Sequence, residues 1–311
     1  MVFCGTPQFA VPTLRALAAE HTISLIVTQP DRPSGRGMEV AVSPVKQLAQ
    51  QLGIAIAQPE KIKQNPGFRA QLEALKPQAI VVVAYGRILP QWMIELPPLG
   101  NINLHASLLP KYRGAAPIQW AIASGESISG VTTMRIDAGL DTGNMLLRRE
   151  EPIAADDTAI TLGARLAEMG GPLMLETLRG LAAGTIYPTP QNNAEATLAP
   201  LLKKEDGLVD FRRTAAEIYN RFRGFQPWPG AYTQFRGKNL KLVALRSATL
   251  SGPQLAPGEI AMIPGDRLLV GTGGENGAIE LLEIQPENRN AMTAAEFARG
   301  ARLAAGERLG S

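Results

Sequence analysis

The sequence predicts an α/β protein of two domains: a doubly wound parallel sheet, followed by a small β-barrel domain with OB-like character. In the first half of the chain, short β-branched runs alternate with helical stretches, the pattern of repeated βαβ units. In the last hundred residues, short strand-like runs are separated by Gly and Pro. The length of 311 residues also favours two domains over one.

The elements of both domains follow from this patterning. We expect the first domain over residues 1–183, a linker over 184–202, which is rich in Pro, Asn, Thr and Ala, and the barrel over 203–311. In the first domain, strands are expected at 2–4, 23–28, 54–57, 79–84, 102–105 and 131–136, and helices at 7–20, 44–52, 68–75 and 159–183. The barrel begins with a helix over 215–223, followed by strands at 231–235, 240–245, 260–263, 268–271 and 278–284.

The composition is that of an ordinary globular protein. Hydrophobic residues make up 45% and charged residues 19%, and mean hydropathy is close to zero, which excludes a membrane bundle and a disordered chain. Met1 leads directly into an apolar run that predicts a first strand rather than a leader. Cys4 is the single cysteine, so no internal disulfide can form, and we expect a reducing compartment, the cytoplasm.

Basic residues are concentrated in one segment. Residues 1–200 balance 16 basic against 16 acidic side chains, whereas residues 203–246 carry ten basic and four acidic ones, together with seven aromatic residues. Such a segment suits a surface that binds a polyanion through phosphate contacts. A solvated helix whose aromatic residues belong to the core explains the pattern equally well.

Polar residues follow two of the expected strands. Asn103 and His105 are two positions apart in a strand, so both side chains point to the same face near its carboxyl end, where ligands of open α/β sheets bind. A second loop, after residues 131–136, carries Asp137 and Asp141 between glycines. Spacing alone does not distinguish these two aspartates as site residues, because an Asx turn explains either one.

Several motifs together resemble the formyltransferases that use 10-formyltetrahydrofolate. The resemblance covers nearly the whole chain and includes a second domain of the type found in members that act on tRNA. The motifs are Asn103-x-His105-x-Ser107-Leu108-Leu109-Pro110, Tyr112-Arg113-Gly114-Ala115-Ala116-Pro117, Leu140-Asp141-Thr142-Gly143, and the segments 5–10, 29–37, 83–90 and 226–231.

The resemblance implies a Rossmann-like catalytic domain and assigns roles to its residues. Asn103, His105 and Asp141 are expected to carry formyl transfer, with the first two as donors to the oxygen that becomes negative and Asp141 as the proton relay. No metal is required. The 10-formyltetrahydrofolate co-substrate is expected to contact Ser107, Leu108, Leu109 and Pro110, and to be held by the backbone near Tyr85, Gly86, Arg87, Ile88 and Leu89.

The resemblance further implies that the formyl group goes to the methionine amine of initiator methionyl-tRNA. We also expect a monomer that does not bind a membrane. Two alternatives remain: formyl transfer to glycinamide ribonucleotide or a nucleotide sugar, and a non-catalytic RNA-binding module. The expected tRNA contacts combine Arg36, by resemblance, with the basic segment. They are Arg36, Arg212, Arg213, Arg221, Arg223, Lys238 and Lys241.

Overall fold

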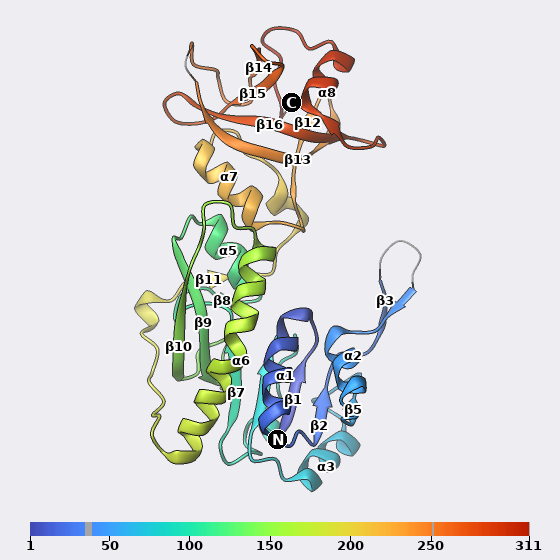
Figure 1. The fold of residues 1–311 in the computed structure, drawn as a ribbon, viewed down its shortest axis with the longest axis vertical. Helices are drawn as coiled ribbons and strands as arrows, with labels where there is room; N and C mark the ends of the chain where they lie inside the picture. Colours follow the sequence, from blue (N-terminus) through green and yellow to red (C-terminus); the bar gives the residue numbers. More distant parts are fainter. Residues whose placement is uncertain (35–38, 251, 311) are drawn as a thin grey trace. The chain divides into compact units, whose positions relative to one another are not determined.

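The computed structural model describes residues 1–34, 39–250 and 252–310, and it divides the chain into two compact units (Figure 1). The first unit contains residues 1–117, 128–152 and 161–200. The second contains residues from 201 onward together with the short segments 118–127 and 153–160. Among the described residues, no helix combines the length and apolar character needed to cross a bilayer.

A seven-stranded sheet forms the centre of the first unit, as far as the chain is described, and confirms the doubly wound α/β class (Figure 1). Its strand order is β10-β9-β7-β6-β1-β2-β5. As expected, five neighbouring strands of this order run parallel; they are β7, β6, β1, β2 and β5. The bounds are β1 (Val2–Gly5), β2 (Leu25–Val27), β5 (Ile56–Ala57), β6 (Ile80–Val83), β7 (Asn101–His105), β9 (Ile128–Arg135) and β10 (Met145–Pro152).

The parallel direction expected for residues 131–136 is wrong. These residues belong to β9, which runs antiparallel to β7 and pairs with β10, a strand the sequence did not predict. Between β7 and β9 the chain forms only the short β8 (Arg113–Gly114) and α5 (Pro117–Ala123). Neither is long enough to return the chain to the amino end of β7. Strand β9 therefore begins near the carboxyl end of β7 and runs antiparallel to it.

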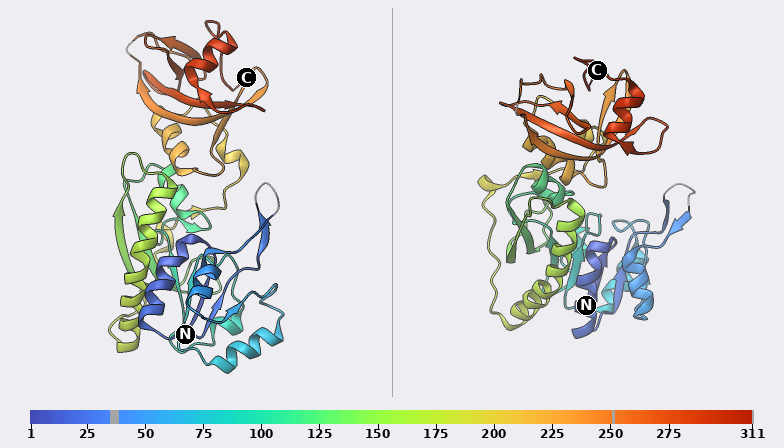
Figure 2. Two further views of the ribbon diagram at one scale, coloured as in Figure 1. Left: turned by 45° about the vertical axis from the view of Figure 1, so that its right-hand side comes forward. Right: turned by 45° about the horizontal axis from the view of Figure 1, so that its top comes forward.

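Helices cover both faces of this sheet (Figures 1 and 2). Phe68 and Leu72 of α3 and Met93 of α4 pack on the face that carries Val82, whereas α6 packs on the Leu104 face. A Cβ at Gly170 of α6 would lie 2.3 Å from Leu104 Cδ2, so the helix approaches this face of the sheet closely at Gly170. The helices are α1 (Val11–Glu20), α2 (Pro44–Gln51), α3 (Pro66–Leu75), α4 (Gln91–Ile94) and α6 (Ala159–Ala183), with a 3-10 turn at Gln8–Ala10.

Residues 184–202 are expected to be a linker; of these, residues 184–200 belong to the first unit and hydrogen-bond to the rest of it. Thr189 exchanges backbone hydrogen bonds with Met145, and β11 (Leu198–Ala199) pairs in parallel with β8. A 3-10 turn lies between them at Asn193–Glu195. A separate two-stranded ladder joins β3 (Arg32–Ser34) to β4 (Glu39–Ala41).

The second unit is built on a curved antiparallel sheet with the order β12-β13-β16-β15-β14, and β17 pairs with β16. Residues 307–310 lie between its edge strands: the Ile260 N–H donates to the Glu307 carbonyl, and the Gly310 N–H donates to the Gln234 carbonyl. The elements are a 3-10 turn (Lys204–Gly207), α7 (Ala215–Gly224), β12 (Ala231–Phe235), β13 (Lys238–Thr249), β14 (Ile260–Ile263), β15 (Arg267–Gly271), β16 (Gly277–Pro286), β17 (Met292–Thr293) and α8 (Ala294–Ala301).

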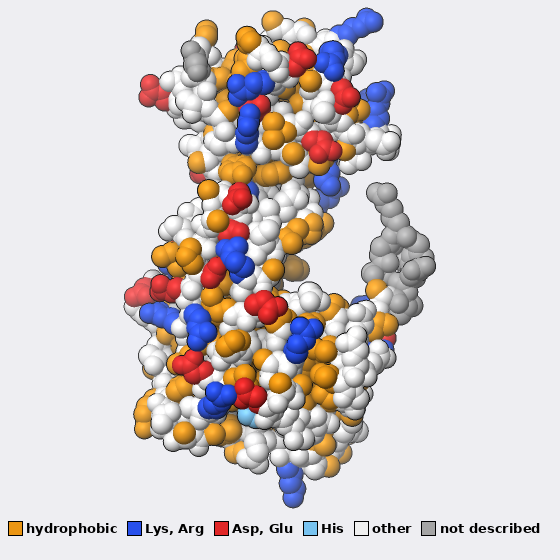
Figure 3. All heavy atoms as spheres, in the orientation of Figure 1, with side chains coloured by type: hydrophobic (Ala, Val, Ile, Leu, Met, Phe, Trp, Pro, Cys, Tyr) orange, Lys and Arg blue, Asp and Glu red, His pale blue; other side chains and the backbone are white. Residues whose placement is uncertain are grey.

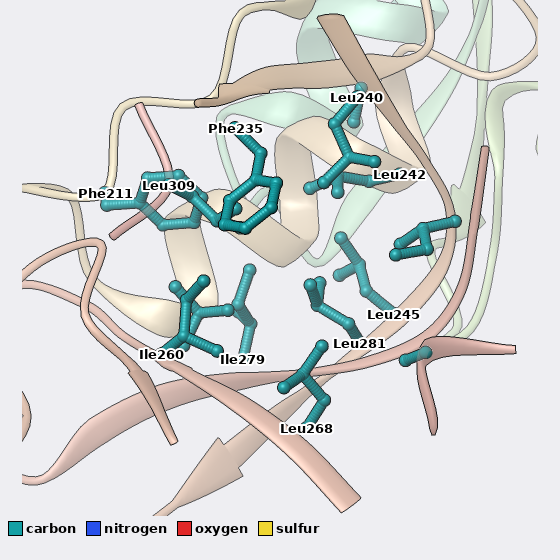
Figure 4. Close-up of a cluster of buried hydrophobic side chains, with 14 of the residues drawn as sticks. Phe211, Phe235, Leu240, Leu242, Leu245, Ile260, Leu268, Ile279, Leu281 and Leu309 are labelled. Atoms are coloured by element: carbon teal, nitrogen blue, oxygen red, sulfur yellow. The ribbon is translucent and has the colours of Figure 1, made fainter. Parts of the chain in front are cut away.

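An apolar core fills the concave side of this sheet (Figure 4). Leu242 and Ile279 are fully buried in it, and Phe235 packs edge-on against Phe297 of α8 with ring centroids 5.2 Å apart. Phe211 also belongs to this core. Part of the aromatic content of the basic segment is therefore structural.

Candidate active site

Strand β7 carries three polar residues on one face, and they have different partners. Asn101, 2% exposed, donates from Nδ2 to the carbonyls of Met93 and Ile94, and so ties the strand to α4. Asn103, two residues nearer the carboxyl end, is half-buried and makes no side-chain hydrogen bond to another described residue. His105 ends the strand and is 6% exposed. The carboxamide of Asn103 is thus available to a ligand, whereas that of Asn101 is not.

The His105 ring has one nitrogen engaged and one facing Asp141. Nε2 lies 2.9 Å from the Tyr112 carbonyl, and because a carbonyl only accepts, Nε2 carries the hydrogen. Nδ1 lies 3.7 Å from Asp141 Oδ2, longer than a direct hydrogen bond. Nδ1 is therefore the ring atom that can exchange a proton or bond with a reactant at this site.

The geometry distinguishes the two aspartates of the loop after β9. Asp137 accepts from the Gly139 N–H and from the Thr142 hydroxyl, so it closes an Asx turn. Asp141 instead reaches β8, where Oδ2 accepts from the Gly114 N–H at 2.9 Å. Its Oδ1 has no hydrogen bond to a described residue, and its backbone is left-handed, with φ of 51°. Asp141 has one oxygen fixed and one free to accept a proton.

Residues 107–110, expected to contact the folate, continue directly from β7. The Ser107 hydroxyl donates to the Lys111 carbonyl at 2.6 Å, and Thr132 Oγ1 donates to the Ser107 carbonyl at 2.7 Å. The peptide bond between Leu109 and Pro110 is cis. Ser107 and Leu109 are buried and Leu108 is half-buried, so the turn has a fixed shape, and the Ser107 hydroxyl already has a partner.

Residues 85–89, expected to hold the pterin ring through peptide groups, continue from the neighbouring strand β6. The Tyr85 side chain is 1% exposed, and burial raises the pKa of its hydroxyl. Its backbone carbonyl accepts from Gln29 Nε2 at 3.0 Å. The peptide groups of Arg87, Ile88 and Leu89 make no hydrogen bond to another described residue. These donors and acceptors fit a planar heterocycle with a hydrogen-bonding edge.

Gln29 is a residue of this region that the sequence reasoning did not single out. It follows β2, and its side chain also donates to the Gly86 carbonyl at 3.3 Å. Gln58 Nε2 donates in turn to the Gln29 carbonyl and to Asp31. Hydrogen bonds from Lys46 and Gln58 hold the pKa of Asp31 below its usual value. Segment 29–37 belongs to the motifs that carry the resemblance, but these motifs gave Gln29 no role; the polar character of residues 29–31 after an apolar strand is the other signal for this network.

The basic residues expected to contact tRNA divide into two groups. Arg223 is only 7% exposed, and its guanidinium donates to the carbonyls of Ala154 and Asp157, so the expectation of a tRNA contact there is replaced by a structural role. Arg221 is half-buried over the rings of Trp120 and Phe225. Burial lowers the pKa of both arginines. Arg36 lies outside the described residues.

The remaining four cations are exposed. Arg212 is held by both oxygens of Asp210, and Arg213 lies 3.8 Å from Glu217. Lys238 and Lys241 make no ion pair with a described residue, and both belong to β13. On the face drawn in Figure 3, Lys and Arg side chains over the second unit alternate with Asp and Glu rather than forming one continuous patch.

Comparison with known sequences gives matches to both units. The family described as formyl transferase matches residues 1–178, and the one described as formyl transferase, C-terminal domain, matches residues 201–302. A relative from Koribacter versatilis is 60% identical over 100% of this chain and 98% of its own length. Relatives from Acidobacterium capsulatum (58%) and Solibacter usitatus (53%) also match 100% of this chain and 99% and 98% of theirs. All three are named methionyl-tRNA formyltransferase.

Solved structures share the fold at lower identity. An N-formyltransferase from Helicobacter canadensis, in complex with folinic acid and dTDP-3-aminofucose, has a TM-score of 0.67 and 19% identity, covering 92% of this chain and 98% of that one. HypX from Aquifex aeolicus, in complex with tetrahydrofolic acid, has a TM-score of 0.59 and 18% identity, covering 96% of this chain and 46% of that one.

Proposed function

Because the chain belongs to the formyl transferase family, we propose that it transfers the formyl group of 10-formyltetrahydrofolate to the α-amino group of methionine on initiator methionyl-tRNA. The acceptor is inferred from the full-length likeness to relatives that carry methionyl-tRNA formyltransferase as their name. The single structural observation that supports the chemistry is the position of His105 Nδ1, 3.7 Å from Asp141 Oδ2, at the carboxyl end of β7.

In the proposed reaction, attack of the amine on the formyl carbon puts negative charge on the formyl oxygen. Asn103 donates from its unengaged carboxamide to that oxygen, and His105 adds a second donor through Nδ1 when that atom carries a hydrogen. The proton leaving the amine passes to the free Oδ1 of Asp141 or through a water held by it. When the tetrahedral intermediate collapses, the bond between the formyl carbon and the folate nitrogen breaks, and that nitrogen takes up a proton through the same groups to leave as tetrahydrofolate.

The folate co-substrate is proposed to lie along the ends of β6 and β7. The peptide groups of Arg87 to Leu89 would hold the pterin, and residues 107–110 would form the wall beside it. Because the Ser107 hydroxyl already bonds the Lys111 carbonyl, we propose that Ser107 shapes this wall rather than binding the ligand through its hydroxyl.

For the tRNA we propose contacts with Arg212, Arg213, Lys238 and Lys241 of the second unit, and a separate contact with Arg36, which lies outside the described residues. The proposed division of labour keeps catalysis in residues 1–183 and places tRNA docking, apart from Arg36, in residues 203–311. We also propose that the protein acts as a monomer in the cytoplasm, where its one cysteine, buried and free, stays reduced.

A formyl-transfer assay with alternative amines tests this proposal. The purified protein and 10-formyltetrahydrofolate are combined with charged initiator tRNA, charged elongator tRNA, glycinamide ribonucleotide or a dTDP-amino sugar. We expect the initiator methionyl-tRNA to be formylated fastest, by orders of magnitude over the small amines. Faster formylation of a small amine would reassign the acceptor, and tight tRNA binding without turnover of any amine would favour the non-catalytic RNA-binding alternative.

A further inference from the structure

Asp141 is held from a segment far along the chain. The side-chain amide of Gln191 donates from Nε2 to two backbone carbonyls of the loop that carries Asp141. They are the carbonyls of Asp141 and Gly143, each at 2.8 Å. Gln191 lies in residues 184–200, which run along the first unit. One amide group therefore fixes the loop on both sides of Thr142.

The orientation of the Gln191 amide is determined by its other partner. Its Oε1 accepts from Arg113 Nε at 3.0 Å and from Arg113 Nη2 at 2.8 Å. A guanidinium only donates and the two carbonyls only accept, so the amide can be satisfied in one orientation alone. Both hydrogens and the oxygen of the side chain are used, which fixes the rotamer of Gln191.

Arg113 is anchored in its turn. It is 7% exposed, belongs to β8, and its Nη2 also donates to Asn193 Oδ1 at 2.8 Å. The next residue, Gly114, supplies the N–H that binds Asp141 Oδ2. These neighbouring residues therefore hold Asp141 in two ways. Gly114 binds its carboxylate directly, and Arg113 acts on the loop backbone through Gln191.

The loop needs such support because Asp141 has a left-handed backbone, with φ of 51°, a conformation that costs an L residue free energy unless its surroundings stabilise it. A carboxylate that must receive a proton from a reactant has to be held in a narrow range of positions. Neither Gln191 nor Arg113 forms a hydrogen bond or ion pair with Asn103 or His105, so their effect on the reaction would pass through Asp141.

We propose that Gln191, oriented by Arg113, is a positioning residue that sets the place of the Asp141 carboxylate in formyl transfer. This inference rests on the proposed function, in which Asp141 accepts a proton. Residues 184–200 would then serve the active site as well as joining the two units.

Gln191→Met tests the inference, because it keeps the length and approximate volume of the side chain and removes its hydrogen bonds. We expect kcat to fall roughly 10- to 100-fold, with KM for tRNA changed by no more than about twofold. Gln191→Glu keeps an acceptor for Arg113 but loses both donations to the loop, so it should lose kcat to a similar extent. Glu195→Gln changes an exposed side chain of the same segment that bonds Asn192 rather than Gln191 or Arg113, and it is the matched control, with kcat within about twofold of wild type.

A double-variant cycle separates positioning from a general structural effect. In an Asp141→Asn background, Gln191→Met should lower kcat by less than about twofold, because the group it positions is already disabled. Full additivity of the two losses, or wild-type kcat in Gln191→Met, would overturn the inference while leaving the proposed function intact. Wild-type kcat in Asp141→Asn would instead remove Asp141 from the proposed mechanism, and the inference with it.

Discussion

The sheets of the two units differ in where their buried polar side chains lie. In the first unit, buried polar side chains lie within β7 and in the residues that follow it; they are Asn101, His105, Ser107 and Arg113. In the second unit, the inward side chains of β13 and β16 are largely apolar, and the buried Glu280 of β16 pairs with the exposed Arg246 and Arg267. Hydrogen bonds therefore hold the side chains around β7 in the first unit, whereas apolar packing holds most inward side chains of the second unit's sheet.

Left-handed backbone beside the candidate site has a different setting from left-handed backbone in the hairpins of the second unit. In the first unit, Ala84, Tyr112 and Asp141 have positive φ and lie in the loops that carry candidate site residues. In the second unit, Arg236 and Asp266 have positive φ in tight turns that join consecutive strands. Strain beside a ligand site is associated with function, whereas strain in a hairpin turn is required by the turn itself. Substitutions should therefore change chemistry in the first region and stability in the second.

Two asparagines of β7 give the sharpest form of this comparison. We expect Asn103→Ala to lower the rate of formyl transfer roughly 10²- to 10³-fold, about 3 to 4 kcal/mol of transition-state stabilisation, because it removes a donor to the developing oxyanion. Its melting temperature should stay that of the wild type, since the carboxamide has no hydrogen bond to a described residue. Single-turnover formylation and thermal unfolding measure the two quantities.

Asn101→Ala is the matched control for that variant. It removes two hydrogen bonds to the carbonyls of Met93 and Ile94 and leaves them buried, so it should cost about 2 kcal/mol of stability with little change in the rate of the folded protein. Equal kinetic losses in the two variants would mean that the two positions of β7 do not differ in function.

The local elements of the first unit were predictable from the sequence because periodicity reports burial. The helix expected at 159–183 matches α6, and the strands expected at 2–4, 79–84 and 102–105 match β1, β6 and β7 within one residue at each end. The antiparallel edge was not predictable: β10 has mostly exposed charged residues over 148–151 and shows no apolar alternation. Helix α8 was missed although Thr293 and Glu296 form a capping box that the sequence contains.

The candidate site was predictable in its residues but not in its supports. Motif resemblance indicated His105 and Asp141, and the structure brings these two within 3.7 Å. Gln191 could not be found in this way, because it is about 50 residues from its partners in a segment without periodicity. The burial of Arg223 was equally hidden, since its acceptors are backbone carbonyls, which exist at every position of a sequence.

Truncating a core side chain of the second unit should lower stability and leave the reaction rate unchanged, the opposite of the effect expected for Asn103→Ala. Leu242 is fully buried among the side chains of the antiparallel sheet, so Leu242→Ala leaves a cavity and should lower the free energy of unfolding by about 3 kcal/mol. Well below the melting temperature, kcat should equal that of the wild type. Denaturant unfolding combined with kinetics at low temperature tests this, and a large loss of kcat in fully folded protein would contradict the division between the units.

The ion-pair cluster around Glu280 gives a pH-dependent effect of smaller size. Glu280 is 3% exposed and accepts from Arg267 and Arg246, and these bonds, that of Arg267 first, lower its pKa. A lowered folded pKa means that the carboxylate contributes stability above its unfolded pKa, and that this is lost as pH falls through the folded value. Glu280→Gln should therefore cost about 2 kcal/mol at pH 7, and the difference should shrink below roughly pH 4.

Glu275 provides the control for that measurement, because it is exposed and lies in the same unit. Glu275→Gln should change stability by less than about 0.5 kcal/mol at either pH. A difference between wild type and Glu280→Gln that persists unchanged to low pH would show that the side chain acts through packing rather than through its charge.

The smallest effect is expected for the exposed cations of β13. Replacing Lys238 and Lys241 together by Glu should raise KM for tRNA roughly fivefold, about 1 kcal/mol, and reduce the slope of log KM against log salt by about 1 to 2, since each lysine is proposed to neutralise one phosphate. Lys61 and Lys63, exposed on the first unit, form the control pair, and their replacement should leave the slope unchanged. The kcat value should not move in either variant, because neither pair touches the β7 edge. An unchanged slope in the β13 variant would remove the second unit's sheet from the proposed docking surface and leave its role to packing alone.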